Sequence, residues 1–267
     1  RRAKKRAYQI VMGKGKNIEE RRRQDYSDLL KVQRKVRGYV QGAIAVVGAD
    51  ASVAYQIEVM ACLAELEGIL PLAEQVYNQA HRRVILGESL PADEKLVSIF
   101  ETHTDIICRG KKGSRAEFGH KVAYATGKSG LVTYYEVLDG NPGDNEVLER
   151  ALDDHIELFE RPPERLTGDR RYHSRYNEQM AEEKGVTRVA FPKAGRLNKA
   201  RAWLQRQPWF RRLIRWRAGV EGNLSTLLRS FGLKRCLWKG WESFNAYVGL
   251  SVVTYNLRLL AGHLCNA

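Results

Sequence analysis

The stretch EFGHKVAYATGKSGLVTYYEVLDG, residues 117–140, decides the fold class of this chain. Two runs rich in Val and Tyr, residues 118–126 and 131–140, flank the glycine-containing turn GKSG at 127–130. β-Branched and aromatic residues on both sides of such a turn predict a β-hairpin. We therefore expect a sheet at this point of the chain, within an α/β fold.

Helical periodicity precedes the hairpin. Apolar residues recur at three- and four-residue spacing from Ser27 to Val46 and again over about 51–87, where Pro71 should end or kink the second helix. Residues 1–90 are thus predicted to form a basic arm followed by a helical hairpin or small bundle. Two further segments before the hairpin have the composition of strands: LVSIF at 96–100 and DIICRG at 105–110.

Strands and helices alternate after the hairpin, which extends the mixed pattern to the end of the chain. The apolar spacing, the prolines and the glycines predict strands that end in RLTGD at 165–169 and cover 186–191, and helices over 145–160, 174–184, 197–230 and 240–262.

The charge balance indicates a polyanionic partner. The chain of 267 residues has 45 Lys and Arg against 31 Asp and Glu, a net charge of +14. Such an excess attracts nucleic acid above all. No apolar run approaches the roughly 18 residues of a spanning helix, and no basic amphipathic helix adjoins an acylation motif, so we expect no membrane partner. The cysteines form no C-x-x-C pair, which argues against structural zinc and is typical of idle thiols in a reducing cytoplasm: Cys62, Cys108, Cys236 and Cys265.

Asp169 is the first candidate for chemistry. It directly follows a predicted strand, and open α/β sheets place ligands at the carboxyl ends of their strands. The alternative is an ordinary N-cap for the next helix. Arg170, Arg171 and Arg175 favour the first reading, because arginines beside a carboxylate bind phosphate well.

Glu221 is the second candidate. On a helix it pairs with Arg217 one turn earlier, and the alternative reading is a surface salt bridge of little value. Gly219 and Gly222 flank it, although each glycine costs about 1 kcal/mol of helix propensity. Their presence predicts close approach by another backbone or by a ligand.

The segment before Glu221 is basic and aromatic. Residues 196–217 contain no acidic residue, and Trp203, Trp209 and Trp216 lie among the arginines. Arginines with aromatic rings suit phosphates and exposed bases, although we expect at least two of the tryptophans to belong to the core. The candidate DNA contacts of this segment are Arg211, Arg212, Arg215 and Arg217.

Six segments together resemble the back half of DDE-type transposases of bacterial insertion sequences. They span about 90–260 and occur in the family's order: SIFETHTDIICRGK, EFGHKVAYAT, GLVTYYEVLDGNPGD, LTGDRRYHS, RAGVEGNLSTLLRSFGLKRC and GWESFNAYVGLSVVTYNL. The resemblance implies an RNase H-like mixed sheet flanked by helices over 91–267, with three carboxylates on two divalent ions, Mg²⁺ or Mn²⁺. It matches Asp169 to the family's second aspartate and Glu221 to its glutamate, as metal ligands and catalytic residues.

The family's first aspartate has no match in this sequence. The resemblance places it on a first strand upstream of a helical stretch like residues 1–90, which would then be an insertion in the catalytic domain. We therefore expect this chain to be the C-terminal portion of such a transposase, without its first strand. Asp105 is the best internal substitute, and Asp93 is a weaker one.

The resulting prediction is a DDE transposase, a polynucleotidyl transferase that cleaves and joins DNA at insertion-sequence ends. The alternatives are a catalytically inactive DNA-binding remnant and another RNase H-like endonuclease. The expected partners are transposon-end and target DNA and further copies of the chain, in a homodimer or larger synaptic complex. The expected location is the bacterial cytoplasm.

Overall fold

The computed structural model describes residues 2–50, 56–107, 116–140 and 142–265. The chain divides into two compact units, Arg1–Ile106 and Ile107–Ala267. Helices alternate with short strands, in agreement with the expected α/β class. A small two-stranded sheet of β1 (Asp105–Ile107) and β2 (Glu117–Gly119) lies where the two units join in sequence.

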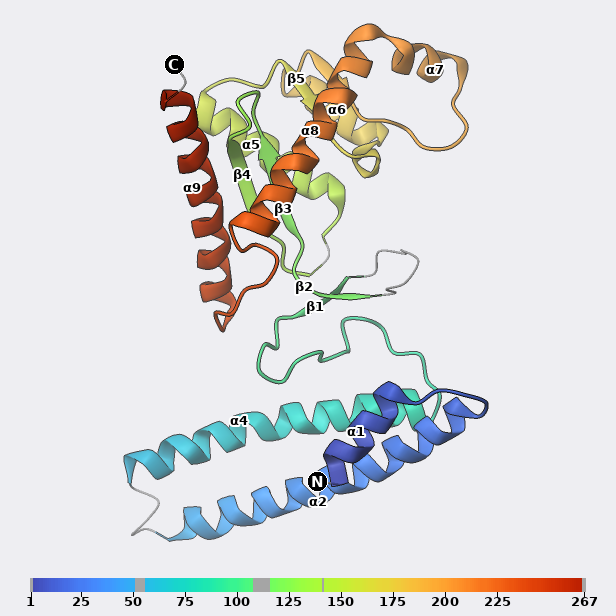
Figure 1. The fold of residues 1–267 in the computed structure, drawn as a ribbon, viewed down its shortest axis with the longest axis vertical. Coiled ribbons are helices and arrows are strands. Elements are labelled where there is room, and N and C mark those ends of the chain that lie inside the picture. The colour runs from blue at the N-terminus through green and yellow to red at the C-terminus, as the bar shows by residue number, and fades with distance from the viewer. Residues whose placement is uncertain (1, 51–55, 108–115, 141, 266–267) are drawn as a thin grey trace. The chain divides into compact units, whose positions relative to one another are not determined.

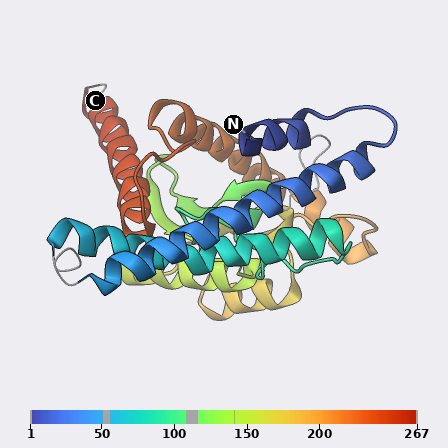
Figure 2. The ribbon, with the colours of Figure 1, turned by 90° about the horizontal axis from the view of Figure 1, so that it is seen from below.

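The first unit is built on a helical hairpin, as the periodicity predicts (Figure 1). Its helices are α1 (Arg2–Met12), α2 (Ile18–Ala49), α4 (Ile57–Ala80) and the π-helix η1 (His81–Ile85). α2 and α4 run side by side in both views (Figure 2). The side-chain amide of Gln33 on α2 donates to the carbonyl oxygen of Ala73 on α4 at 2.9 Å, and Arg37 forms a 3.3 Å ion pair with Glu74.

The guanidinium of Arg6 fastens α1 to α2. It lies 2.8 Å from the carboxylate of Asp25 and 2.6 Å from that of Asp28. Asp28 is buried, so its negative charge requires such a partner. The basic arm expected at the start of the chain is therefore an ordered helix packed on the hairpin.

Of the two outcomes expected at Pro71, an end or a kink, the helix end is excluded, because α4 continues through the proline. Contacts with α2 at Ala73 and Glu74 hold the turn that follows it. The expectation of a strand at 96–100 was wrong. The segment 96–100 forms no strand in the described structure. The amide of Gln79 instead bonds both backbone groups of Leu96, accepting from its N–H at 2.9 Å and donating to its carbonyl at 2.8 Å.

The second unit contains two strand pairs. The predicted hairpin is confirmed: β3 (Val122–Thr126) and β4 (Val132–Val137) pair antiparallel, with a bulge between Ala125 and Thr126. β5 (Arg165–Thr167) and β6 (Arg188–Ala190) pair in parallel. The helices of this unit are α5 (Asp144–Phe159), the 3-10 turn η2 (Arg170–Tyr172), α6 (Arg175–Glu183), α7 (Lys199–Arg206), α8 (Pro208–Ser230) and α9 (Trp241–Cys265).

Each strand pair has its own hydrophobic cluster. Leu152 of α5 and Met180 of α6 pack around Phe191, the fully buried residue that follows β6. Val132 of β4 packs with Leu227 of α8 and with residues of α9. The amphipathic faces of α5 and α8 are thus used in separate clusters, which fix the helices against the strand pairs.

Helix α9 holds the start of β4 through one amide side chain. Asn256 accepts a hydrogen bond from the backbone N–H of Val132 at 2.9 Å and donates one to its carbonyl at 2.8 Å. The hydroxyl of Tyr255 donates to the carbonyl of Gly130 at 3.2 Å. The turn 127–130 therefore has a fixed position beside α9 before any ligand binds.

Candidate functional site

Asp169 lies at the carboxyl edge of the parallel strand pair. It follows β5 by two residues, and its carboxylate accepts a hydrogen bond from the N–H of Arg170 at 2.6 Å, as the N-cap of η2. The intervening Gly168 is required, because a Cβ there would lie 2.9 Å from the ring of Tyr172 and 3.1 Å from that of Phe191. The capping bond holds the carboxylate in place and leaves its other lone pairs exposed to solvent.

Three exposed arginines follow Asp169 within six residues of sequence. Arg170, Arg171 and Arg175 form no ion pair with any carboxylate in the described part of the chain. Burial, and next the positive charge of Arg201, lower the pKa of His173. His173 is therefore neutral at pH 7, so the positive charge near Asp169 comes from the arginines.

Glu221 lies in the middle of α8 and is exposed. Its carboxylate is 3.4 Å from the guanidinium of Arg217, which confirms the predicted pairing one turn apart. The hydroxyl of Tyr124 on β3 donates to the carbonyl of Val220 at 3.3 Å, so α8 passes close to the hairpin beside Glu221. Burial above all, and next the charge of Glu221, raise the pKa of Tyr124 to about 12.

Positive charge and exposed tryptophans line α7 and α8. Arg211, Arg212 and Arg215 are exposed. The expectation that at least two of the three tryptophans are core residues was wrong, since Trp203 is 66% and Trp216 40% exposed. The buried aromatic residue of this segment is Phe210, which leaves these indoles available to a ligand.

Sequence reasoning missed a pocket between the β3–β4 turn and α8. We call it the turn pocket; its volume is about 240 Å³. The residues that matter to its chemistry are Gly127, Lys128 and Gly130 from the turn and Trp216, Gly219 and Asn223 from α8. The motif GKSG was recognised only as a turn, because nothing in the sequence indicates that a helix some 90 residues later packs beside it.

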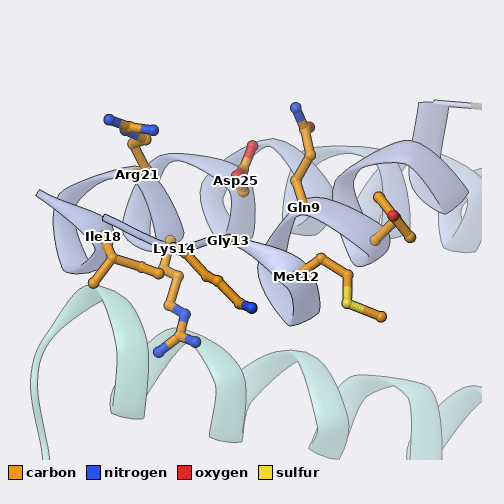
Figure 3. Close-up of a pocket in the computed structure, with 9 residues that line it drawn as sticks. Gln9, Met12, Gly13, Lys14, Ile18, Arg21 and Asp25 are labelled. Atoms are coloured by element: carbon orange, nitrogen blue, oxygen red, sulfur yellow. The ribbon is translucent and has the colours of Figure 1, made fainter. Parts of the chain in front are cut away.

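A second, more basic pocket belongs to the first unit. It has a volume of about 230 Å³ and lies between α1 and the start of α2 (Figure 3). Lys14, Arg21 and Arg22 line it, and all three are exposed. Residues 1–37 hold fourteen Lys and Arg against four Asp and Glu, so a large part of the net charge is concentrated on α1 and α2.

The donor chemistry of the two candidate carboxylates fits a divalent ion. Asp169 and Glu221 are exposed and offer the hard oxygen ligands that Mg²⁺ prefers. Among the residues that the structure describes, no group of three or more His, Cys, Asp or Glu is placed to hold a metal. Asp105, the internal substitute for the first aspartate, is on β1 and completes no such group.

The comparisons with known proteins give one finding. A family model described as the transposase DDE domain matches residues 90–257. No curated protein and no solved structure matches the chain. In the described residues, none of the helices is long and apolar enough to span a membrane.

Proposed function

The chain belongs to the transposase DDE domain family, whose members act in DNA transposition, and on that premise we propose that it cleaves and joins DNA strands at insertion-sequence ends. The observation that carries the proposal is the match over residues 90–257, which includes both Asp169 and Glu221. The chemistry is phosphoryl transfer by a polynucleotidyl transferase in the bacterial cytoplasm.

We propose that Asp169 and Glu221 are catalytic metal ligands. The family uses divalent metal ions, and Mg²⁺ or Mn²⁺ bound here would activate a water or 3′-hydroxyl and stabilise the leaving oxygen. Arg217, 3.4 Å from Glu221, orients that carboxylate. Asp105 is the first residue to test as a third ligand.

The arginines supply the DNA contacts in this proposal. An arginine without a carboxylate partner can bind a phosphate without breaking an existing ion pair. The proposed contacts of this kind are Arg170, Arg171, Arg175, Arg211, Arg212 and Arg215. Arg217, the partner of Glu221, is a further proposed contact. The basic surface of α1 and α2 adds a sequence-independent contact with the DNA backbone.

The proposed fold is RNase H-like, and the proposed catalytic region is 91–267. The family match over residues 90–257 supports this proposal. In the described structure the hairpin and the parallel pair are separate two-stranded sheets, with α5 and α9 beside the hairpin. Residues 1–90 would be a separate helical region. Val46 and Ile57 of its hairpin are 72% and 85% exposed, which supports self-association of two copies in a synaptic complex.

The test compares the chain with its Asp169→Asn and Glu221→Gln variants on DNA that carries the element's ends, with Mg²⁺ or Mn²⁺. Loss of metal-bound charge stabilisation, worth several kcal/mol, should lower cleavage and joining at least about a hundredfold. Asp154→Asn is the matched control, because Asp154 is an exposed carboxylate on α5.

The alternatives give different results in the same assay. An RNase H-like endonuclease would cut without joining. A non-catalytic remnant would bind DNA with salt-sensitive affinity but would neither cleave nor join it. The parent and all three variants would then show no cleavage or joining. Equal activity of Asp169→Asn and the parent would overturn the assignment of Asp169.

A further inference from the structure

The turn pocket has a rigid wall. The side-chain amide of Asn223 and the hydroxyl of Tyr255 both donate to the carbonyl of Gly130, at 3.4 and 3.2 Å. Asn256 holds the adjacent Val132 by both of its backbone groups. Side chains from both α8 and α9 therefore hold this turn by hydrogen bonds. A site whose conformation is fixed before binding loses little conformational entropy when a ligand binds.

The opposite wall is left open by a glycine. A Cβ added at Gly219 would meet no atom within 4 Å, so no packing contact in the described structure requires a glycine there. Glycine nevertheless costs about 1 kcal/mol in a helix interior relative to alanine. Among the described residues, no other backbone approaches Gly219 or Gly222 within 4 Å of an added Cβ, and of the two only Gly219 lines the turn pocket.

The side chains around this space differ in chemistry and complement one another. Trp216 presents a partly exposed indole, and Lys128 an exposed ammonium with no ion pair to any described carboxylate. An aromatic face and a cation fit a ligand with a planar ring and a phosphate.

We propose that the turn pocket binds one unpaired nucleotide of the DNA substrate, stacked on Trp216 with its phosphate beside Lys128. The volume of about 240 Å³ is below the range of drug-sized ligands, which suits one base. Val220 lines the pocket, and Glu221 follows it on the same helix. This inference rests on the proposed function, because it specifies how the same site holds DNA.

The test measures binding without divalent metal, so that failure of catalysis does not affect it. The probe is a duplex with a short 3′ overhang that contains 2-aminopurine, whose fluorescence falls when it stacks on an indole; a blunt duplex serves for comparison. Trp216→Ala should weaken binding of the overhang DNA roughly tenfold, abolish the quenching and leave blunt-duplex affinity nearly unchanged. Trp238→Ala, which removes a more exposed indole outside the pocket and outside the basic segment 196–217, should leave both signals intact.

A pair of glycine variants tests the space itself. Gly219→Leu fills the pocket, whereas Gly222→Leu places the same side chain on the same helix, also in open space but outside the pocket. Only Gly219→Leu should lower overhang affinity. The proposal is overturned if the two leucine variants bind alike, or if Trp216→Ala weakens blunt and overhang DNA equally, since the residues would then contact the backbone only.

Failure of this proposal is distinguishable from failure of the proposed function. Loss of cleavage in Asp169→Asn with intact 2-aminopurine quenching would support both the catalytic proposal and nucleotide binding in the turn pocket. Quenching by a parent chain that cleaves no DNA would support nucleotide binding in the pocket and contradict the catalytic proposal. Cleavage by the parent without quenching would support the catalytic proposal and contradict nucleotide binding in the pocket.

Discussion

The hydroxyl of Tyr124 on β3 donates a hydrogen bond to the carbonyl of Val220 on α8, at 3.3 Å, and so joins the hairpin to the helix that carries Glu221. Burial first, and Glu221 second, raise the pKa of Tyr124 from 10 to about 12. A tyrosine whose pKa is raised on folding stabilises the protein below its unfolded value, and that contribution is lost as the pH rises through the folded value. The relevant window is therefore about pH 10 to 12.

We predict that stability of the parent falls between pH 10 and 12 and that Tyr124→Phe makes this fall shallower. Urea unfolding at several pH values measures it. Tyr134, whose pKa burial also raises, remains as a background contribution. Glu221→Gln should lower the pKa of Tyr124 in an ultraviolet titration, because it removes a negative charge near the phenol; an unchanged titration would contradict the proximity of the two groups.

Replacing Asn256 by alanine should destabilise the chain by about 2–4 kcal/mol. The change leaves the N–H and carbonyl of the buried Val132 without their partner, and each unsatisfied group costs roughly 1–3 kcal/mol. Asn245→Ala on the same helix is the control, since the side-chain amide of Asn245 donates to the carbonyl of Trp241, one turn earlier within α9. Equal losses of unfolding free energy in the two variants would show that Asn256 has no special role.

The ion pair between Arg201 and Glu178 should contribute far more than the pair between Arg165 and Glu164. The first has side chains 10% and 25% exposed and a distance of 2.6 Å, and Arg201 also donates to the carbonyl of Phe191. Arg201→Met should therefore cost about 2–4 kcal/mol. Arg165→Met, at an exposed 3.0 Å pair, should cost under about 1 kcal/mol. Comparable losses in thermal or urea unfolding would contradict this ranking.

Replacing Arg21 and Arg22 by glutamate should weaken binding to any duplex, whatever its sequence. Both residues are exposed at the basic pocket of the first unit. The plot of log affinity against log salt concentration has a negative slope, and the loss of two phosphate contacts makes that slope shallower by about 1.8. Lysine at both positions preserves the charge and should preserve the slope. A slope unchanged by the glutamates would exclude this surface as a DNA contact.

The sequence predicted the elements whose signal is local. The two runs rich in Val and Tyr on either side of GKSG predicted the hairpin, and the spacing of Leu148 and Leu152 predicted α5. The pairing of Arg217 with Glu221 was predictable for the same reason, because residues four apart on a helix are neighbours.

The rest depends on contacts distant in sequence. The position of α8 beside the turn comes from the hydrogen bonds of Tyr124 with Val220 and of Asn223 with Gly130, and each joins residues more than 90 positions apart. Hydrophobic periodicity cannot show this, and it also misassigned the tryptophans, whose size suggests burial more strongly than their basic neighbours suggest exposure. The segment around Leu96 has a strand's composition. The N–H and carbonyl of Leu96, however, bond to the side chain of Gln79 and not to another strand.

The amide of Asn256 has a consequence for assembly as well as for stability. A strand edge with free N–H and carbonyl groups is a template for other chains, and proteins that expose one risk aggregation. At Val132 both groups face α9 and are already occupied. An incoming strand would have to displace the side chain of Asn256 before it could pair with Val132. Helix α9 therefore blocks the start of the β4 edge and protects the hairpin from pairing with another copy of the chain there.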